Sequence, residues 1–135
     1  ATSGEDDEPD KRQRILEGAL TAFAQKGFYN PKVSEIADEA DVADGTIYLY
    51  FENKDDLLIS LFEDRMEWII TRLQKELGEV EGGIVAKVRR FVELHFQLAV
   101  ENPELAEFIT VELRQSAKFI KEYDNPKFGD YLGIL

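Results

Sequence analysis

The chain has 135 residues, 44% of them hydrophobic and 33% charged, with a formal net charge of −12, which is typical of a globular chain about one domain long. No apolar run approaches the roughly 20 residues of a membrane span, and the acidic N-terminus differs from the basic start of a secretory signal, so we expect a cytoplasmic protein with no membrane partner. The chain has no Cys, which excludes disulfides, and its single His, His95, argues against a metal centre.

The charge is unevenly spread along the chain. Residues 1–10 hold five acids and no base, whereas residues 11–54 hold six bases and seven acids. Residues 55–135 are again acidic, with ten bases and sixteen acids. The segment 11–54, in which acids and bases are nearly equal in number, is compatible with a DNA contact. It lacks, however, the strongly basic composition that is typical of DNA-binding proteins.

Residues 1–9 are expected to form a disordered acidic arm, and the first helix is expected to begin at Asp10. Asp10 and Gln13 have the spacing of an N-cap and its capping-box partner. The apolar residues that follow recur with helical spacing, at Ile15, Leu16, Ala19, Leu20, Phe23 and Ala24. Gly27 is expected to end this helix in a left-handed conformation.

Two short helices are predicted next. Asn30 and Pro31 have the sequence of an N-cap followed by proline at the first helical position, so a helix of about two turns is expected to start there. Asp41 is expected to adopt the left-handed conformation after it, because Asp tolerates that conformation better than most residues. A third short helix is expected to open at Ala43 or Asp44.

The rest of the chain is also predicted to be helical. Asn53 is expected to cap a long helix over residues 54–77, with one apolar face at Leu58, Leu61, Phe62, Arg65, Ile69, Leu73 and Leu77. After two glycines, a fifth helix is expected to bury one face made of Ile84, Val88, Phe91, Val92, His95, Leu98 and Ala99. A sixth helix follows Pro103. No segment alternates with the period of a strand, so the predicted fold class is all-α.

Residues 32–51 have the pattern of a helix-turn-helix, in which two short helices are joined by a brief turn. Ile36, Ala37, Val42 and Ile47 are expected to hold the two helices together. The second helix would then present small, polar and aromatic residues to the major groove, which admits one helix: Asp44, Gly45, Thr46, Tyr48 and Tyr50. Lys54, at the start of the next helix, adds a cation and a helix N-terminus for the DNA backbone.

The run VSEIADEADVADGTIYLYFENKDDLL closely resembles the DNA-binding region of the TetR family of bacterial transcriptional repressors, most distinctively in GTIYLYFENK. The resemblance covers residues 11–62. VADGTIYLYF with the later VELRQS further resembles the acyl-CoA-responsive branch of the family, which controls fatty-acid degradation. The resemblance to the TetR family implies a DNA-binding domain over 10–53 and a helical ligand-binding and dimerisation domain over 54–135. The second domain is expected to be truncated, because the family's dimer-forming helices come later in the chain.

The resemblance also implies roles for single residues. Thr46 and Tyr48 would lie at base-edge or phosphate positions, and Tyr50 and Lys54 match the family's usual phosphate contacts. Ser34 is a further candidate for contact with DNA.

Four positions depart from the family's pattern. Lys32, also a candidate DNA contact, stands where the family commonly has Thr, and Asp41 stands where it has Gly. Ala43 and Asp44 replace a Ser and a basic residue. Phosphates repel the Asp44 carboxylate, which can nevertheless accept a hydrogen bond from the amino group of cytosine.

Candidate ligand-binding residues lie in the later helices: Phe62, Trp68, Phe91, His95, Phe108, Glu112 and Arg114. The aromatic residues among them are either core residues or the lining of an apolar site. His95 lies in an apolar stripe, where a core histidine bonded to the backbone is the commoner case. Glu112 also falls on an apolar stripe and needs a partner, because burying an unpaired carboxylate is costly.

No phosphate-binding loop, nucleophile elbow or metal-binding motif is present, so we expect no enzyme, no cofactor and no metal site. The expected function is that of a homodimeric repressor, which binds a palindromic double-stranded DNA operator and is released by an apolar effector such as a long-chain acyl-CoA. Two alternatives stay open. One is the same repressor sensing an aromatic drug-like effector; the other is a helical interaction module without operator binding, which the net charge and Asp44 favour.

Overall fold

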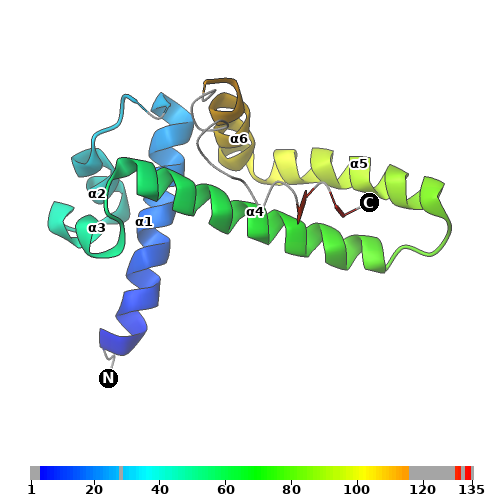
Figure 1. Cartoon of the computed structure of the whole chain (residues 1–135), viewed down its shortest axis with the longest axis horizontal. Helices are drawn as coiled ribbons and strands as arrows, with labels where there is room; N and C mark the ends of the chain where they lie inside the picture. The colour runs from blue at the N-terminus through cyan, green and yellow to red at the C-terminus, as the bar shows by residue number, and fades with distance from the viewer. Residues whose placement is uncertain (1–3, 28, 116–129, 132, 135) are drawn as a thin grey trace. The chain divides into compact units, whose positions relative to one another are not determined.

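The computed structural model describes the backbone of residues 4–27, 29–115, 130–131 and 133–134 and, except for residues 4–10 and 111–115, their side chains. Its elements are α1 (Gly4–Lys26), α2 (Val33–Ala40), α3 (Asp44–Tyr50), α4 (Lys54–Gly78), α5 (Ile84–Glu101) and α6 (Pro103–Gln115) (Figure 1). No strand occurs in these residues, and the all-α prediction is confirmed. None of the described helices combines the length and the apolar character that crossing a membrane requires.

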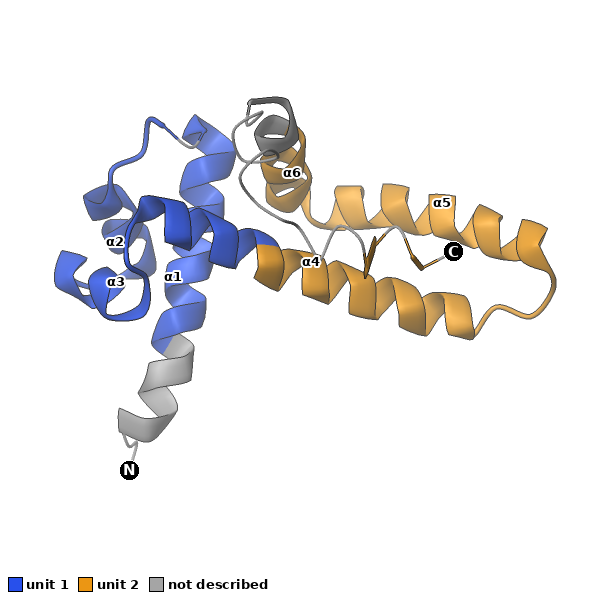
Figure 2. Cartoon of the chain, viewed as in Figure 1, with its two compact units in different colours: residues 1–62 blue, residues 63–135 orange. Residues whose placement is uncertain are grey.

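The chain divides into two compact units, Ala1–Phe62 and Glu63–Leu135, and the division falls inside α4 (Figure 2). The resemblance to the family implies a second domain that starts at residue 54, the first residue of α4. The first turns of α4 belong to unit 1 because their apolar residues, Leu57, Leu58 and Leu61, are buried as part of its core.

In unit 1, α1 packs closely on α2 through fully buried side chains, among them Leu16, Phe23 and Ile36. Gly18 permits this approach. A Cβ atom at Gly18 would lie 3.1 Å from both the Ala40 nitrogen and the Ile36 carbonyl oxygen. Of the apolar residues predicted for the first helix, four are buried, Ile15, Leu16, Ala19 and Phe23, whereas Leu20 and Ala24 are half-buried.

The predicted ends of the helices depend on local contacts, and three of them are confirmed. Gly27 has φ 78°, and its N–H donates to the carbonyl of Phe23 at 2.8 Å. Asp41 is also left-handed, with φ 57°. Asn53 caps α4, because its Oδ1 accepts a hydrogen bond of 2.8 Å from the Asp56 N–H.

The start of α1 differs from the prediction. The helix begins at Gly4, not at Asp10, so residues 4–9 are helical rather than a disordered arm. The acids of residues 5–8 fall in its first turns, where the helix dipole favours negative charge.

The start of α2 also differs. The helix begins at Val33 with Lys32 at the N-cap, whereas the sequence predicts Pro31 at the first helical position. Asn30 instead completes α1, since its side-chain amide donates to the carbonyl of Lys26 at 2.9 Å. Pro31 is fully buried in the connection between the two helices.

In unit 2, α5 runs back alongside the C-terminal part of α4 (Figure 1). Two ion pairs join these helices: Arg90 Nη2 lies 3.0 Å from Glu76 Oε2, and Arg72 Nη1 lies 3.1 Å from Glu101 Oε2. Among the described residues of this unit, the buried apolar side chains are Met66, Ile69, Ile70, Leu73, Leu77, Leu94, Leu98, Leu105 and Phe108.

The apolar face predicted for the fifth helix is only partly correct. Leu98 is buried as expected, and Phe91 and His95 are half-buried. The other residues predicted for this face are exposed: Ile84, Val88, Val92 and Ala99. Leu94, which the predicted face omits, is buried. α5 carries apolar side chains on most of its sides, whereas the neighbouring elements that the structure describes cover only one face of the helix. Which face is covered depends on packing, which the helical period does not specify.

Candidate nucleic-acid interface

The orientation of α3 is fixed by Ile47, which is only 2% exposed. Ile47 lies opposite a face formed by Asp44, Gly45, Tyr48 and Leu49, all of them exposed. We call these four residues the exposed face of α3. They stand one turn apart in pairs, so a single approaching surface can contact them together.

The α3 residues that point outward are not all the ones that the sequence predicts. Asp44, Gly45 and Tyr48 are exposed as predicted, whereas Thr46 and Tyr50 are half-buried. Leu49, which the sequence analysis left out of the candidate set, is 81% exposed. An apolar residue in an amphipathic helix normally belongs to the core, so nothing in the local pattern identified Leu49.

The two candidates on α2 lie at its start. Lys32 is the exposed N-cap residue, and Ser34 is half-buried. Next to them, Glu35 accepts a hydrogen bond of 2.8 Å from Lys26 Nζ, which ties the last turn of α1 to α2. This hydrogen bond lowers the pKa of the Glu35 carboxyl below its ordinary value.

Lys54 has a structural role that the sequence did not predict. Its Nζ donates hydrogen bonds to the carbonyl oxygens of Pro31, at 3.1 Å, and Tyr29, at 3.3 Å. Burial lowers the pKa of Lys54. These bonds connect the start of α4 to the loop between α1 and α2, while the role of Lys54 at a phosphate stays a prediction.

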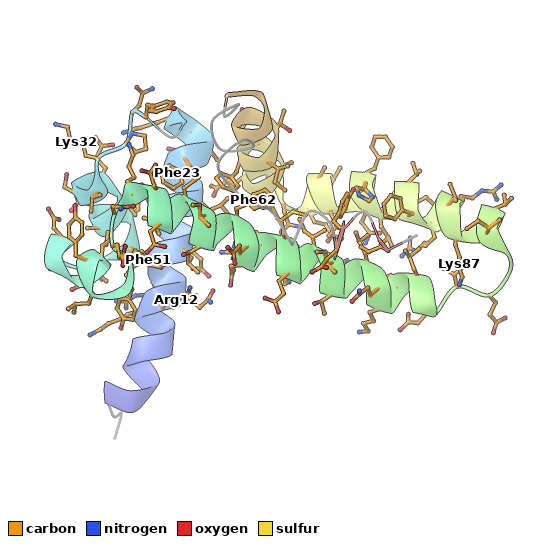
Figure 3. All side chains as sticks on the ribbon, in the orientation of Figure 1. Arg12, Phe23, Lys32, Phe51, Phe62 and Lys87 are labelled. Atoms are coloured by element: carbon orange, nitrogen blue, oxygen red, sulfur yellow. The ribbon has the colours of Figure 1, made fainter. Side chains whose placement is uncertain are left out.

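Arg12 links α1 to the junction between α3 and α4. Its guanidinium carbon lies 5.4 Å from the centroid of the Phe51 ring (Figure 3), within the range of a cation–π interaction. Phe51 itself is buried. The C-terminal end of α3 is therefore anchored to α1.

The candidate ligand residues are divided between the two units. Phe62 and Phe108 are buried, but Phe62 belongs to unit 1 and Phe108 to unit 2. Trp68 is 41% exposed, although a core position was the default expectation. The side chains of Glu112 and Arg114 lie outside the described residues.

Two of the candidates do meet, in a cluster that includes a third residue. His95 Nδ1 lies 2.7 Å from the carbonyl oxygen of Phe91, and because a carbonyl only accepts, Nδ1 carries the proton. His95 Nε2 is hydrogen-bonded to the hydroxyl of Tyr131, whose pKa is raised by burial. The expected backbone bond of His95 is confirmed. Tyr131 was missed, since it lies 36 residues away in the sequence.

Arg65 on α4 is a further half-buried polar residue of unit 2. Its Nη1 lies 3.5 Å from Asp64 Oδ2, while its Nε is buried and has no acceptor among the described residues. No group of three or more His, Asp or Glu in the described part of the chain is placed to hold a metal ion.

The chain is similar to known bacterial regulators. It is 38% identical over 125 residues to the fatty acid metabolism regulator protein of Bacillus subtilis (strain 168), an overlap of 93% of this chain and 64% of that protein. Its structure is similar to that of the transcriptional regulator FadR from Bacillus subtilis in complex with stearoyl-CoA, with a TM-score of 0.82, 38% identity and coverage of 91% of this chain and 66% of that one.

A second solved structure, the fatty acid degradation regulator FadR from Bacillus halodurans, gives a TM-score of 0.81 with 36% identity, covering 91% of this chain and 66% of that one. The chain thus spans just under two thirds of the length of these relatives. Residues 15–61 match the family profile described as bacterial regulatory proteins, tetR family, and residues 62–135 match the YsiA-like protein, C-terminal region. The chain therefore belongs to the tetR family of bacterial regulatory proteins.

Proposed function

We propose that this protein is a transcriptional repressor that binds double-stranded DNA through α2 and α3. The observation that carries the proposal is the exposed face of α3, held outward by the buried Ile47 in a chain of the tetR family. A helix presented in this way fits the major groove. The proposed base-facing residues are Asp44, Gly45, Thr46 and Tyr48, and the proposed phosphate-facing residues are Lys32, Ser34, Tyr50 and Lys54.

The proposed active form is a homodimer. With seven residues, α3 reaches only a few base pairs, so a specific operator needs two copies. Two recognition helices then address successive major grooves about 34–36 Å apart, or a multiple of that spacing. Footprinting with the intact protein should reveal a palindromic site, and protection of one asymmetric half-site would contradict the dimer.

DNA binding itself is tested by selecting duplexes from a random-sequence library with the intact protein and measuring their affinity by gel shift. We expect enrichment of one palindromic sequence. The net charge of −12 favours a different function, an interaction module without operator binding. Failure to enrich any sequence, with the protein folded, would support that second function.

The proposed effector is a long-chain acyl-CoA that releases the repressor from DNA. Stearoyl-CoA is bound in the FadR structure to which this chain is similar. Unit 2 offers both kinds of group that such a ligand needs: exposed or half-buried apolar side chains, such as Trp68 and Phe91, and polar groups at His95 and Arg65.

A large apolar ligand also suits the energetics of release. Moving a repressor from mostly bound to mostly free requires a ligand that prefers the released form by several kcal/mol. A buried acyl chain supplies about 0.8 kcal/mol per CH₂ group. Because α4 contributes residues to both units, we propose that a displacement along α4 carries the effect of the ligand to Lys54 and the DNA-binding helices.

The effector is tested by titrating acyl-CoAs of increasing chain length against a preformed protein–DNA complex. We expect release that becomes more efficient as the chain lengthens, with free coenzyme A as the inactive control. Release by a planar aromatic compound, and by no acyl-CoA, would contradict the acyl-CoA proposal and leave the drug-sensing repressor.

A further inference from the structure

The exposed face of α3 has an unusual chemistry for a recognition helix. It presents a carboxylate at Asp44, no side chain at Gly45, a phenol at Tyr48 and an apolar side chain at Leu49. Of the two large side chains, Leu49 is the more exposed, at 81% against 55% for Tyr48. The helix contains no Arg, Lys, Asn or Gln.

This composition restricts which bases α3 can read. Guanine offers two acceptors, to which one Arg or Lys side chain donates two hydrogen bonds. Adenine is recognised by two hydrogen bonds with one Asn or Gln side chain. The exposed face of α3 has none of these four residue types, so it cannot make the paired hydrogen bonds that identify a purine. Thymine differs from the other bases in its 5-methyl group, which is recognised by apolar contact.

We propose that Leu49 contacts the 5-methyl group of a thymine in each half-site and is a specificity-determining residue of α3. This inference rests on the DNA-binding function proposed above. The contact removes the apolar surface of Leu49 and the methyl group from water together, which is favourable. Cytosine at that position lacks the methyl group and leaves Leu49 uncovered.

The experiment begins with the palindromic duplex selected by the intact protein. Each thymine is replaced in turn by deoxyuridine, which removes the 5-methyl group and keeps every hydrogen-bonding atom. At one thymine of each half-site we expect about a fourfold loss of affinity, the value of one apolar carbon group. Replacing that pair by C·G should lower the affinity, and 5-methylcytosine should recover part of it.

The Leu49→Ala variant identifies the side chain responsible. It should bind the thymine and deoxyuridine duplexes equally well at that position, whereas Leu49→Met should keep the difference. Because Leu49 is exposed, the thermal midpoint of both variants should match that of the wild type.

The outcomes separate this inference from the proposed function. Enrichment of a palindrome that binds equally well with deoxyuridine at every thymine would overturn the role of Leu49 and leave DNA binding intact. A difference in affinity between the thymine and deoxyuridine duplexes that persists unchanged in Leu49→Ala would also overturn the role of Leu49. A lack of any enriched sequence would overturn the proposed function itself.

Discussion

The ammonium group of Lys54, at the first residue of α4, donates a hydrogen bond of 3.1 Å to the carbonyl oxygen of Pro31. The two residues are 23 positions apart. The bond joins the helix that leads into unit 2 to the loop that precedes the helix-turn-helix. Lys54 is thus a candidate both for a phosphate contact and for the positioning of α2.

Replacing Lys54 by Met separates these two roles. Loss of the hydrogen bonds to Pro31 and Tyr29 should lower the free energy of unfolding by about 1–3 kcal/mol. Loss of the charge should reduce the salt dependence of DNA binding by about one phosphate contact. Chemical denaturation and gel shifts at several salt concentrations measure the two effects.

The exposed Lys87 on α5 provides a matched control (Figure 3), since Lys87→Met removes the same charge and should change neither quantity appreciably. A lower stability of the Lys54 variant with an unchanged salt dependence would confine Lys54 to a structural role.

Gly18→Ala should destabilise the protein even though Ala favours helices. The gain in helix propensity is about 1 kcal/mol, but the new Cβ would lie 3.1 Å from two backbone atoms of α2. Backbone atoms cannot move aside singly, so overpacking should cost about 1–3 kcal/mol. Thermal unfolding should show a lower midpoint, whereas Gly78→Ala, where nothing lies within 4 Å of the new Cβ, should not.

Glu35→Gln should lower stability at neutral pH and have little effect in acid. Because the hydrogen bond from Lys26 lowers the pKa of Glu35 in the folded state, its stabilisation is present above the ordinary carboxyl pKa. It is lost as the pH falls below the ordinary range of glutamate carboxyls and through the lowered pKa of Glu35. The midpoints of the variant and the wild type, compared at several pH values, should converge in acid.

Asp38→Asn, on the exposed side of the same helix, serves as the control for the change in charge. If the Glu35 variant differed from the wild type equally at every pH, the ion pair would not be the cause.

Asn53→Ala should cost about 1 kcal/mol of stability, because the N–H of Asp56 loses its acceptor at the start of α4. Asn53→Asp keeps an oxygen in the same place and should retain the wild-type stability. Urea denaturation of both variants tests this assignment. Equal losses in the two would show that the cap does not depend on the Asn53 oxygen.

The class of the fold, the helix-turn-helix and most of the helix ends can be predicted from the sequence. Gly27, Asp41 and Asn53 act on groups a few residues away, so local chemistry decides their conformation. The buried positions of α1 follow the helical period for a related reason: one stripe of each turn faces the core. The start of α2 was misplaced, because burial of Pro31 in the loop prevailed over the preference of proline for a first helical position.

The side chains that remain accessible depend on how the helices pack, which the sequence pattern does not specify. The outward position of Leu49, the exposed valines of α5 and the bond between His95 and Tyr131 all depend on which elements cover which faces. The contact of Lys54 with Pro31 likewise joins residues that no periodic pattern relates. Helical periodicity identifies the residues that can be buried together, whereas the packing of neighbouring elements selects those that are.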